Sequence, residues 1–184
     1  MLWRLENAGV AVAARWDELA DKVEKRVDDH LLVFADLHFV LALAAAGRGA
    51  KLDRMIESMH IAISTRRTTQ EQVLAEVGAA LAQAIRVQYQ GDYELSIRLM
   101  LPLRYRVRDI GGSHAQRDIF SKMLIEAALK NGKHGLARAL LHERIAVKPG
   151  SARSWNLLAD AFDCEGKASD AAEARSRAEQ LREA

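Results

Sequence analysis

The stretch that decides the fold lies towards the C-terminus, where residues 155–178 read WNLLADAFDCEGKASDAAEARSRA. Apolar side chains recur at Trp155, Leu158 and Phe162, with the three- or four-residue spacing of one face of an α-helix. Gly166 then interrupts the pattern, as glycine often does just beyond a helix end. A second stripe, made of alanines, follows it. The stretch therefore predicts two helices joined by a tight turn.

This hairpin recurs along the chain with a characteristic period. Gly132 lies 34 residues before Gly166, and 34 residues is the length of a tetratricopeptide repeat. In the quoted stretch, the consensus positions of that repeat are occupied by Trp155, Leu158, Ala159, Phe162, Gly166, Ala171 and Ala178. Arg175 stands at a late position where phenylalanine is usual. One period upstream, the same frame contains Leu124, Gly132, Ala137, Leu141 and Pro149. Two in-register repeats predict a tetratricopeptide-like segment.

Helical periodicity continues through the rest of the chain. Residues 33–44 are apolar on most sides, apart from Asp36 and His38, and predict a central, buried helix. No run alternates over the length of a strand. The first amphipathic stripe comprises Trp16, Leu19, Ala20, Val23 and Val27. We predict an all-α fold, a tetratricopeptide-like α-solenoid of about four antiparallel helical hairpins. It forms a single helical-repeat domain over residues 1–184, with looser hairpins over 10–112 and tetratricopeptide-like repeats over 113–184.

Composition narrows the class of protein. Lys and Arg number 27 against 25 Asp and Glu, a balance that does not favour nucleic acid as a partner. The single cysteine, Cys164, excludes a disulfide framework and is expected to be a small core residue in a reducing compartment. The most apolar stretch, residues 39–46, is far shorter than a membrane span, and Glu6 comes too early for a signal peptide. We therefore predict a soluble, cytoplasmic protein without a membrane partner.

A glycine pair marks a turn before one predicted helix. Gly111 and Gly112 permit positive φ, and Ser113 with Gln116 three residues later matches a capping box at a helix start. The alternative is that the free N–H groups of this turn, together with Arg117, hold an anion. We favour the capping interpretation, because a cap satisfies the same donors.

Arginines that precede this turn give the anion alternative some support. They alternate with other residues around Tyr105, but solvated arginines and one aromatic ring do not make a nucleic-acid platform. The candidate residues for anion or partner binding are Arg104, Arg106, Arg108, Ser113, His114 and Arg117.

Aspartates and histidines near residue 30 have the side-chain types of a metal site. They are Asp28, Asp29, His30, Asp36 and His38. Their spacing matches no helical metal motif, because ligands on one helix face lie three or four residues apart. We favour structural roles, with Asp28 or Asp29 capping a helix over 30–46 and with Asp36 or His38 paired to a neighbouring helix. His30 and His38 are the metal ligands to test if this is wrong. No catalytic residue and no cofactor is predicted.

Several motifs resemble the tetratricopeptide repeat protein 38-like family. They are residues 110–118 (IGGSHAQRD), 2–6 (LWRLE), 15–16 (RW), 28–30 (DDH) and 34–38 (FADLH). The resemblance covers the whole of this chain, which corresponds to only the C-terminal part of a typical family member. Family members carry a further helical N-terminal half. It implies a helical-repeat fold, without a defined activity or site residues to transfer.

Two functional hypotheses follow. The first is a protein-interaction module, not an enzyme, that binds a peptide or protein in the concave groove of the solenoid. The alternative is an enzyme or a small-ligand or metal-binding protein whose site lies where residues 28–38 approach the loop over 110–118.

A quaternary expectation concerns the N-terminal edge. The missing family half would leave Leu2, Trp3 and Leu5 uncovered, and solenoid ends need a polar cap. We therefore predict homodimerisation through this edge. Light scattering over a concentration series tests it, and a monomer at every concentration contradicts it.

Overall fold

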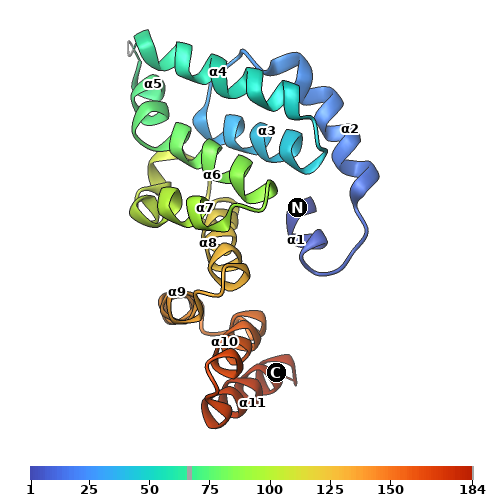
Figure 1. Cartoon of the computed structure of the whole chain (residues 1–184), viewed down its shortest axis with the longest axis vertical. Helices are drawn as coiled ribbons and strands as arrows, with labels where there is room; N and C mark the ends of the chain where they lie inside the picture. The colour runs from blue at the N-terminus through green and yellow to red at the C-terminus, as the bar shows by residue number, and fades with distance from the viewer. Residues whose placement is uncertain (66–67, 184) are drawn as a thin grey trace. The chain divides into compact units, whose positions relative to one another are not determined.

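The chain folds into helices joined by short turns (Figure 1). The structure, a computed structural model, describes residues 1–65 and 68–183, and no strand occurs within these ranges. The prediction of an all-α fold is confirmed. By backbone contacts the chain divides into two compact units, Met1–Ser121 and Lys122–Ala184, called unit 1 and unit 2 below.

Unit 1 is built around one buried helix. Its helices are α1 (Leu2–Glu6), α2 (Ala13–Val23), α3 (Val33–Ala45), α4 (Gly49–Thr65), α5 (Thr69–Val73), α6 (Ala79–Tyr89), α7 (Tyr93–Met100) and the first turns of α8 (His114–Lys130). Helix α3 packs against α2, α4 and α6 (Figure 1), and its Leu37 and Leu43 are fully buried. The predicted central, apolar helix is confirmed. Burial of apolar surface from three sides is what stabilises it.

The entry into α3 differs from the prediction. The helix begins at Val33, and neither Asp28 nor Asp29 caps it, because His30 takes a left-handed conformation at φ 41° and the chain reaches Leu32 in an extended one. Asp28 instead pairs with Arg54 of α4 at 2.7 Å, and Asp29 with Arg26 at 2.8 Å. The predicted helix over 30–46 therefore starts three residues late. Positive φ at a residue other than glycine is strained and is uncommon in proteins.

A wide helical turn brings α6 close to α3. Residues Leu74–Gly78 form a π-helical turn between α5 and α6, and Gly78 is buried. A Cβ atom at Gly78 would lie 2.6 Å from Cγ1 of Val33, so only glycine permits this approach.

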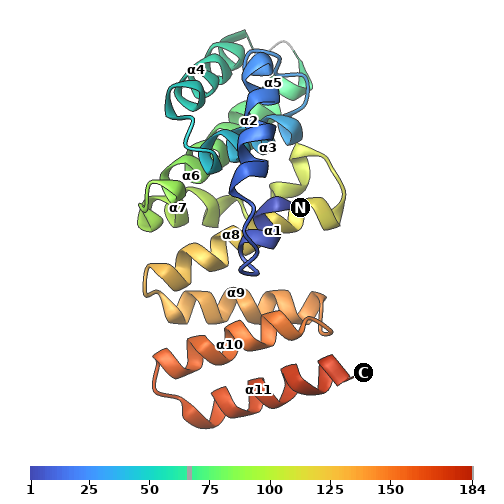
Figure 2. The same ribbon diagram turned by 90° about the vertical axis from the view of Figure 1, so that its right-hand side faces the viewer.

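Unit 2 contains the C-terminal hairpin. Its helices are the later turns of α8, α9 (His134–Val147), α10 (Ala152–Cys164) and α11 (Ala168–Glu183). Helices α10 and α11 lie side by side and antiparallel (Figure 2), with Ala171, Ala174 and Ala178 buried between them. Cys164 is exposed, which corrects the expectation of a core residue: it is the last residue of α10 and lies beyond the packed face. No helix among the described residues is both long and apolar enough to cross a bilayer.

Candidate functional site

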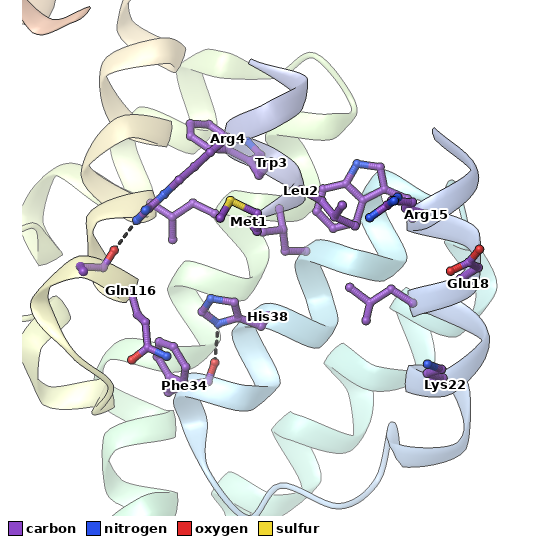
Figure 3. A pocket seen from close by; sticks show the side chains of 15 residues that line it. Met1, Leu2, Trp3, Arg4, Arg15, Glu18, Lys22, Phe34, His38 and Gln116 are labelled. Carbon is purple, nitrogen blue, oxygen red and sulfur yellow. Dashed lines mark hydrogen bonds between the residues drawn. The ribbon is translucent and has the colours of Figure 1, made fainter. Parts of the chain in front are cut away.

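Unit 1 contains a cavity of about 570 Å³ bounded by α1, α2, α3 and the first turns of α8 (Figure 3). We call it the N-terminal pocket. The buried part of its lining is apolar and comes from Trp3, Trp16, Leu41 and Ile119. Its volume falls within the range of about 300–1,000 Å³ typical of small-ligand sites in proteins.

Helix α2 supplies both the depth and the edge of the pocket. Trp16 is 4% exposed, whereas Leu19, one turn further on, is 39% exposed although the periodicity assigns it to the same stripe. Leu19 lines the pocket, so the stripe contributes to the pocket here rather than to the packed core.

His38 is a partly buried polar residue that lines the cavity (Figure 3). Its Nδ1 lies 2.8 Å from the carbonyl oxygen of Phe34, and because a carbonyl only accepts, Nδ1 carries the proton. In the neutral ring, Nε2 is then a hydrogen-bond acceptor. Burial lowers the pKa of His38 below its ordinary value, against the opposing effect of the Phe34 carbonyl and with a smaller lowering effect from the amino-terminal charge.

Charged side chains surround the mouth of the pocket. Arg4 donates from α1 to the carbonyl oxygen of Ala115 in α8 and lies 3.9 Å from Asp118, which makes it a strap over one side (Figure 3). Arg15 and Lys22 of α2 are exposed at the mouth, and neither makes an ion pair within 4.0 Å among the described residues. Two unpaired cations therefore face solvent beside an apolar cavity.

The structure brings together the two segments that the sequence analysis placed near each other. A Cβ atom at Gly112 would lie 2.6 Å from the Phe34 ring, and the rings of His38 and Phe120 pack edge to face at 6.1 Å. The expected approach of residues 28–38 to the loop over 110–118 is therefore confirmed. The pocket lies at this junction, with Phe34 and His38 on one side and Gln116 on the other.

The glycine turn has the capping geometry that we favoured. Gly111 and Gly112 have φ values of 88° and 75°. The Ser113 N–H donates to Gln116 Oε1 at 2.8 Å, and the Gln116 N–H donates to Ser113 Oγ at 3.3 Å. Arg117 donates to the carbonyl oxygens of Gly111 and Gly112. The donors of the proposed anion cradle are thus directed to protein acceptors, and His114 is exposed at the start of α8.

The arginines before the turn all have partners within the protein, away from the pocket. Arg104 stacks on Tyr105, with its guanidinium carbon 4.1 Å from the ring centroid. Arg106 pairs with Glu76 at 2.6 Å and with Asp109 at 3.1 Å, and Arg108 lies 3.6 Å from Asp109. None of these arginines lines the N-terminal pocket. They do not converge on one site with Ser113 and Arg117.

Two of the candidate metal residues, His30 and Asp36, lie close to Ser58 of α4, a residue that sequence reasoning missed, and we call the three the His30 cluster. His30 Nδ1 lies 3.4 Å from Asp36 Oδ2 without a hydrogen bond between them, and His30 Nε2 is hydrogen-bonded to Ser58 Oγ at 2.8 Å. Asp36 therefore pairs with the preceding loop and His38 with its own helix, which corrects the expectation of a partner on a neighbouring helix. Ser58 lies 28 residues from His30, and no spacing motif joins them.

The His30 cluster has the residue types of a Ser-His-Asp triad, but its serine–histidine hydrogen bond runs in the opposite direction. Ser58 Oγ also lies 2.8 Å from the carbonyl oxygen of Val27, which can only accept its proton. The serine oxygen then accepts from His30 Nε2–H, whereas a nucleophilic serine donates to its histidine. Among the described residues, no group of three potential ligands is placed to hold a metal ion. We interpret the His30 cluster as a structural clamp that holds the strained turn at His30.

No family model matches the chain. The resemblance described above therefore rests on its quoted motifs alone.

The lowered pKa of His38 predicts a pH-dependent stability for unit 1. The unfolded chain binds a proton near the ordinary pKa of 6.5, before the folded chain does, so the free energy of unfolding decreases as the pH falls below that value. The decrease ends below the folded pKa, where both states are protonated. In His38→Asn, which keeps a donor near the Phe34 carbonyl, the acidic loss of stability is expected to shrink.

Urea denaturation at pH 5 to 8 measures this effect. A Trp155→Phe background leaves only Trp3 and Trp16, both in unit 1, as tryptophan reporters. Parallel stability curves for the parent and His38→Asn across this pH range would contradict the prediction.

Proposed function

We propose that the chain is a helical-repeat recognition module of the tetratricopeptide repeat protein 38-like type. In this proposal it acts in the cytoplasm, binds a peptide or protein partner and does no chemistry on it. The antiparallel hairpin of α10 and α11 and the in-register repeat motifs support a tetratricopeptide-like solenoid. Homodimerisation through Leu2, Trp3 and Leu5 remains part of the proposal, although Trp3 is only 5% exposed.

The observation that carries the proposal is the N-terminal pocket. Its lining combines a buried apolar interior with unpaired cations at the mouth, as in sites that bind an apolar group carrying a polar or negative end. Its walls come from α1, α2, α3 and α8, so the helical array itself fixes their relative positions. A recognition site on rigid elements requires no large rearrangement to bind.

A peptide selection tests this proposal. The folded chain is used to select from a library of random peptides displayed with free C-termini, and the enriched peptides are titrated by tryptophan fluorescence in the Trp155→Phe background. Ala115 is an exposed, small residue at the mouth of the pocket, and Ala115→Trp is expected to weaken binding at least tenfold by filling the entrance.

The matched control is Ala146→Trp, which makes the same substitution at an exposed position of α9 outside the pocket. It is expected to leave the affinity unchanged. A library without enriched peptides, or peptides that bind both variants equally, would refute the proposal.

A small-ligand protein is the second candidate function. It is favoured by the place of the pocket, at the junction of residues 28–38 with the loop over 110–118, and by a volume large enough for a free small molecule. Native mass spectrometry of the chain isolated from cells, with fragmentation of any bound molecule, separates the two. Fragments that differ by amino-acid residue masses identify a peptide, and a bound molecule without them favours a small ligand.

A further inference from the structure

We propose that the N-terminal pocket recognises a carboxylate joined to an apolar group, in the form of the free C-terminus of a peptide whose last residue is apolar. This inference rests on the proposed function and specifies its ligand. Three features of the pocket each select one part of such a ligand: the cations at the mouth, the apolar interior and the acceptor nitrogen of His38.

The cations select the negative charge. Arg15 lines the pocket on the side opposite the Arg4 strap (Figure 3), and it has no carboxylate partner among the described residues. An arginine can bind both oxygens of a carboxylate through two parallel N–H groups, which a neutral amide does not match. Lys22, two turns further along α2, adds a second positive charge at the same mouth.

One carboxylate of the protein limits the charge of the ligand. Glu18 lies between Arg15 and Lys22 on α2, and among the described residues no ion pair within 4.0 Å joins it to either. A second negative charge on the ligand would approach Glu18 and would be repelled. The mouth therefore suits one carboxylate rather than a strongly acidic segment or a polyanion.

The interior selects the apolar group. Trp3, Leu41 and Ile119 are buried at its base, and Phe34 lies at its side. A charged or strongly polar side chain would lose its hydration there without gaining a partner, whereas an aliphatic or aromatic one gains by leaving water.

His38 selects a hydrogen-bond donor inside the cavity. Its Nδ1 proton is committed to the Phe34 carbonyl, so Nε2 offers a lone pair to the cavity. A peptide C-terminus carries an amide N–H on the same Cα atom as its carboxylate and side chain. A simple fatty acid has no such donor and would leave Nε2 unpaired.

The test compares peptides that differ in one group. The probes are acetylated pentapeptides ending in leucine, valine or phenylalanine, each prepared as the free acid, as the C-terminal amide and with an N-methyl group on the last peptide nitrogen. Binding is followed by the fluorescence of Trp3 and Trp16 in the Trp155→Phe background. The free acid is expected to bind about tenfold more tightly than the amide and than the N-methylated acid.

Two variants assign these differences to residues. Arg15→Gln is expected to abolish the preference for acid over amide, and Lys25→Gln, which removes the same charge outside the pocket, is expected to keep it. His38→Phe keeps a ring beside Phe34 but removes the acceptor. In that variant, N-methylation is expected to have no further effect.

The outcomes separate this inference from the proposed function. Equal binding of acid and amide would overturn the inference and leave peptide recognition intact. Failure of all the pentapeptides, while library-selected peptides still bind, would do the same. N-Acetylleucine carries the same carboxylate, amide and side chain without a peptide. If it binds as tightly as the pentapeptides, carboxylate recognition stands and the peptide source is refuted.

Discussion

Gly112→Ala is expected to destabilise unit 1 by about 2–5 kcal/mol. The residue has φ 75°, where a side chain costs about 1–2 kcal/mol, and its new Cβ atom would lie 2.6 Å from the Phe34 ring. Overpacking of this kind adds about 1–3 kcal/mol. The ring has to move away from the turn, and it lines the N-terminal pocket. Urea denaturation measures the first effect, and peptide affinity measures the second.

Gly47→Ala is the matched control within unit 1. Gly47 has a similar φ, 68°, but apart from its immediate chain neighbours no atom lies within 4 Å of the place that the new methyl group would take. It is expected to lose about 1–2 kcal/mol through strain alone and to keep its peptide affinity. Equal losses for the two substitutions would show that contact with Phe34 contributes nothing.

Asp36→Ala is expected to cost about 2–4 kcal/mol. Asp36 is 2% exposed, and its Oδ2 lies 3.4 Å from Nδ1 of His30, whose side chain is 9% exposed. Removing one member of a buried polar pair leaves the other desolvated and unpaired, which costs more than the pair contributes. The carboxylate also lies in the first turn of α3, which has no side-chain cap, so the helix dipole loses a favourable charge.

Asp29→Ala tests whether burial is the cause. Asp29 pairs with Arg26 at 2.8 Å in the same loop region, but both side chains are exposed, at 40% and 54%. Exposed pairs contribute about 0–1 kcal/mol, so the urea midpoint is expected to change little. An Asp36 variant as stable as the Asp29 variant would refute the clamp on His30.

Local sequence patterns predicted the helices well, because each depends on residues only three or four positions apart. The apolar character of α3 predicted a central helix. The Ser113–Gln116 spacing predicted the capping box of α8. The error at the start of α3 has a physical cause. The aspartates before it are good caps, but one strained residue, His30, keeps the chain out of the helix until Val33.

The candidate site was less predictable, because its parts come from distant segments. Residues 28–38 and 110–118 were expected to meet, and they do, but nothing in the sequence assigns Trp3 and Trp16 to the same cavity. Ser58 has no pattern that links it to His30. The exposure of Leu19 marks the pocket, but exposure is known only from the structure and could not be read from the sequence.

The Arg4 strap has a consequence for how the protein is made. Arg4 and Ala115 are 111 residues apart, so the pocket closes only after almost the whole of unit 1 has been synthesised. Contacts over such separations form late in folding, since the intervening chain must first lose its freedom. A nascent chain that has not yet exposed α8 lacks one wall and is expected to bind no peptide. Peptide binding by the nascent chain would therefore indicate that the synthesis of unit 1 is complete.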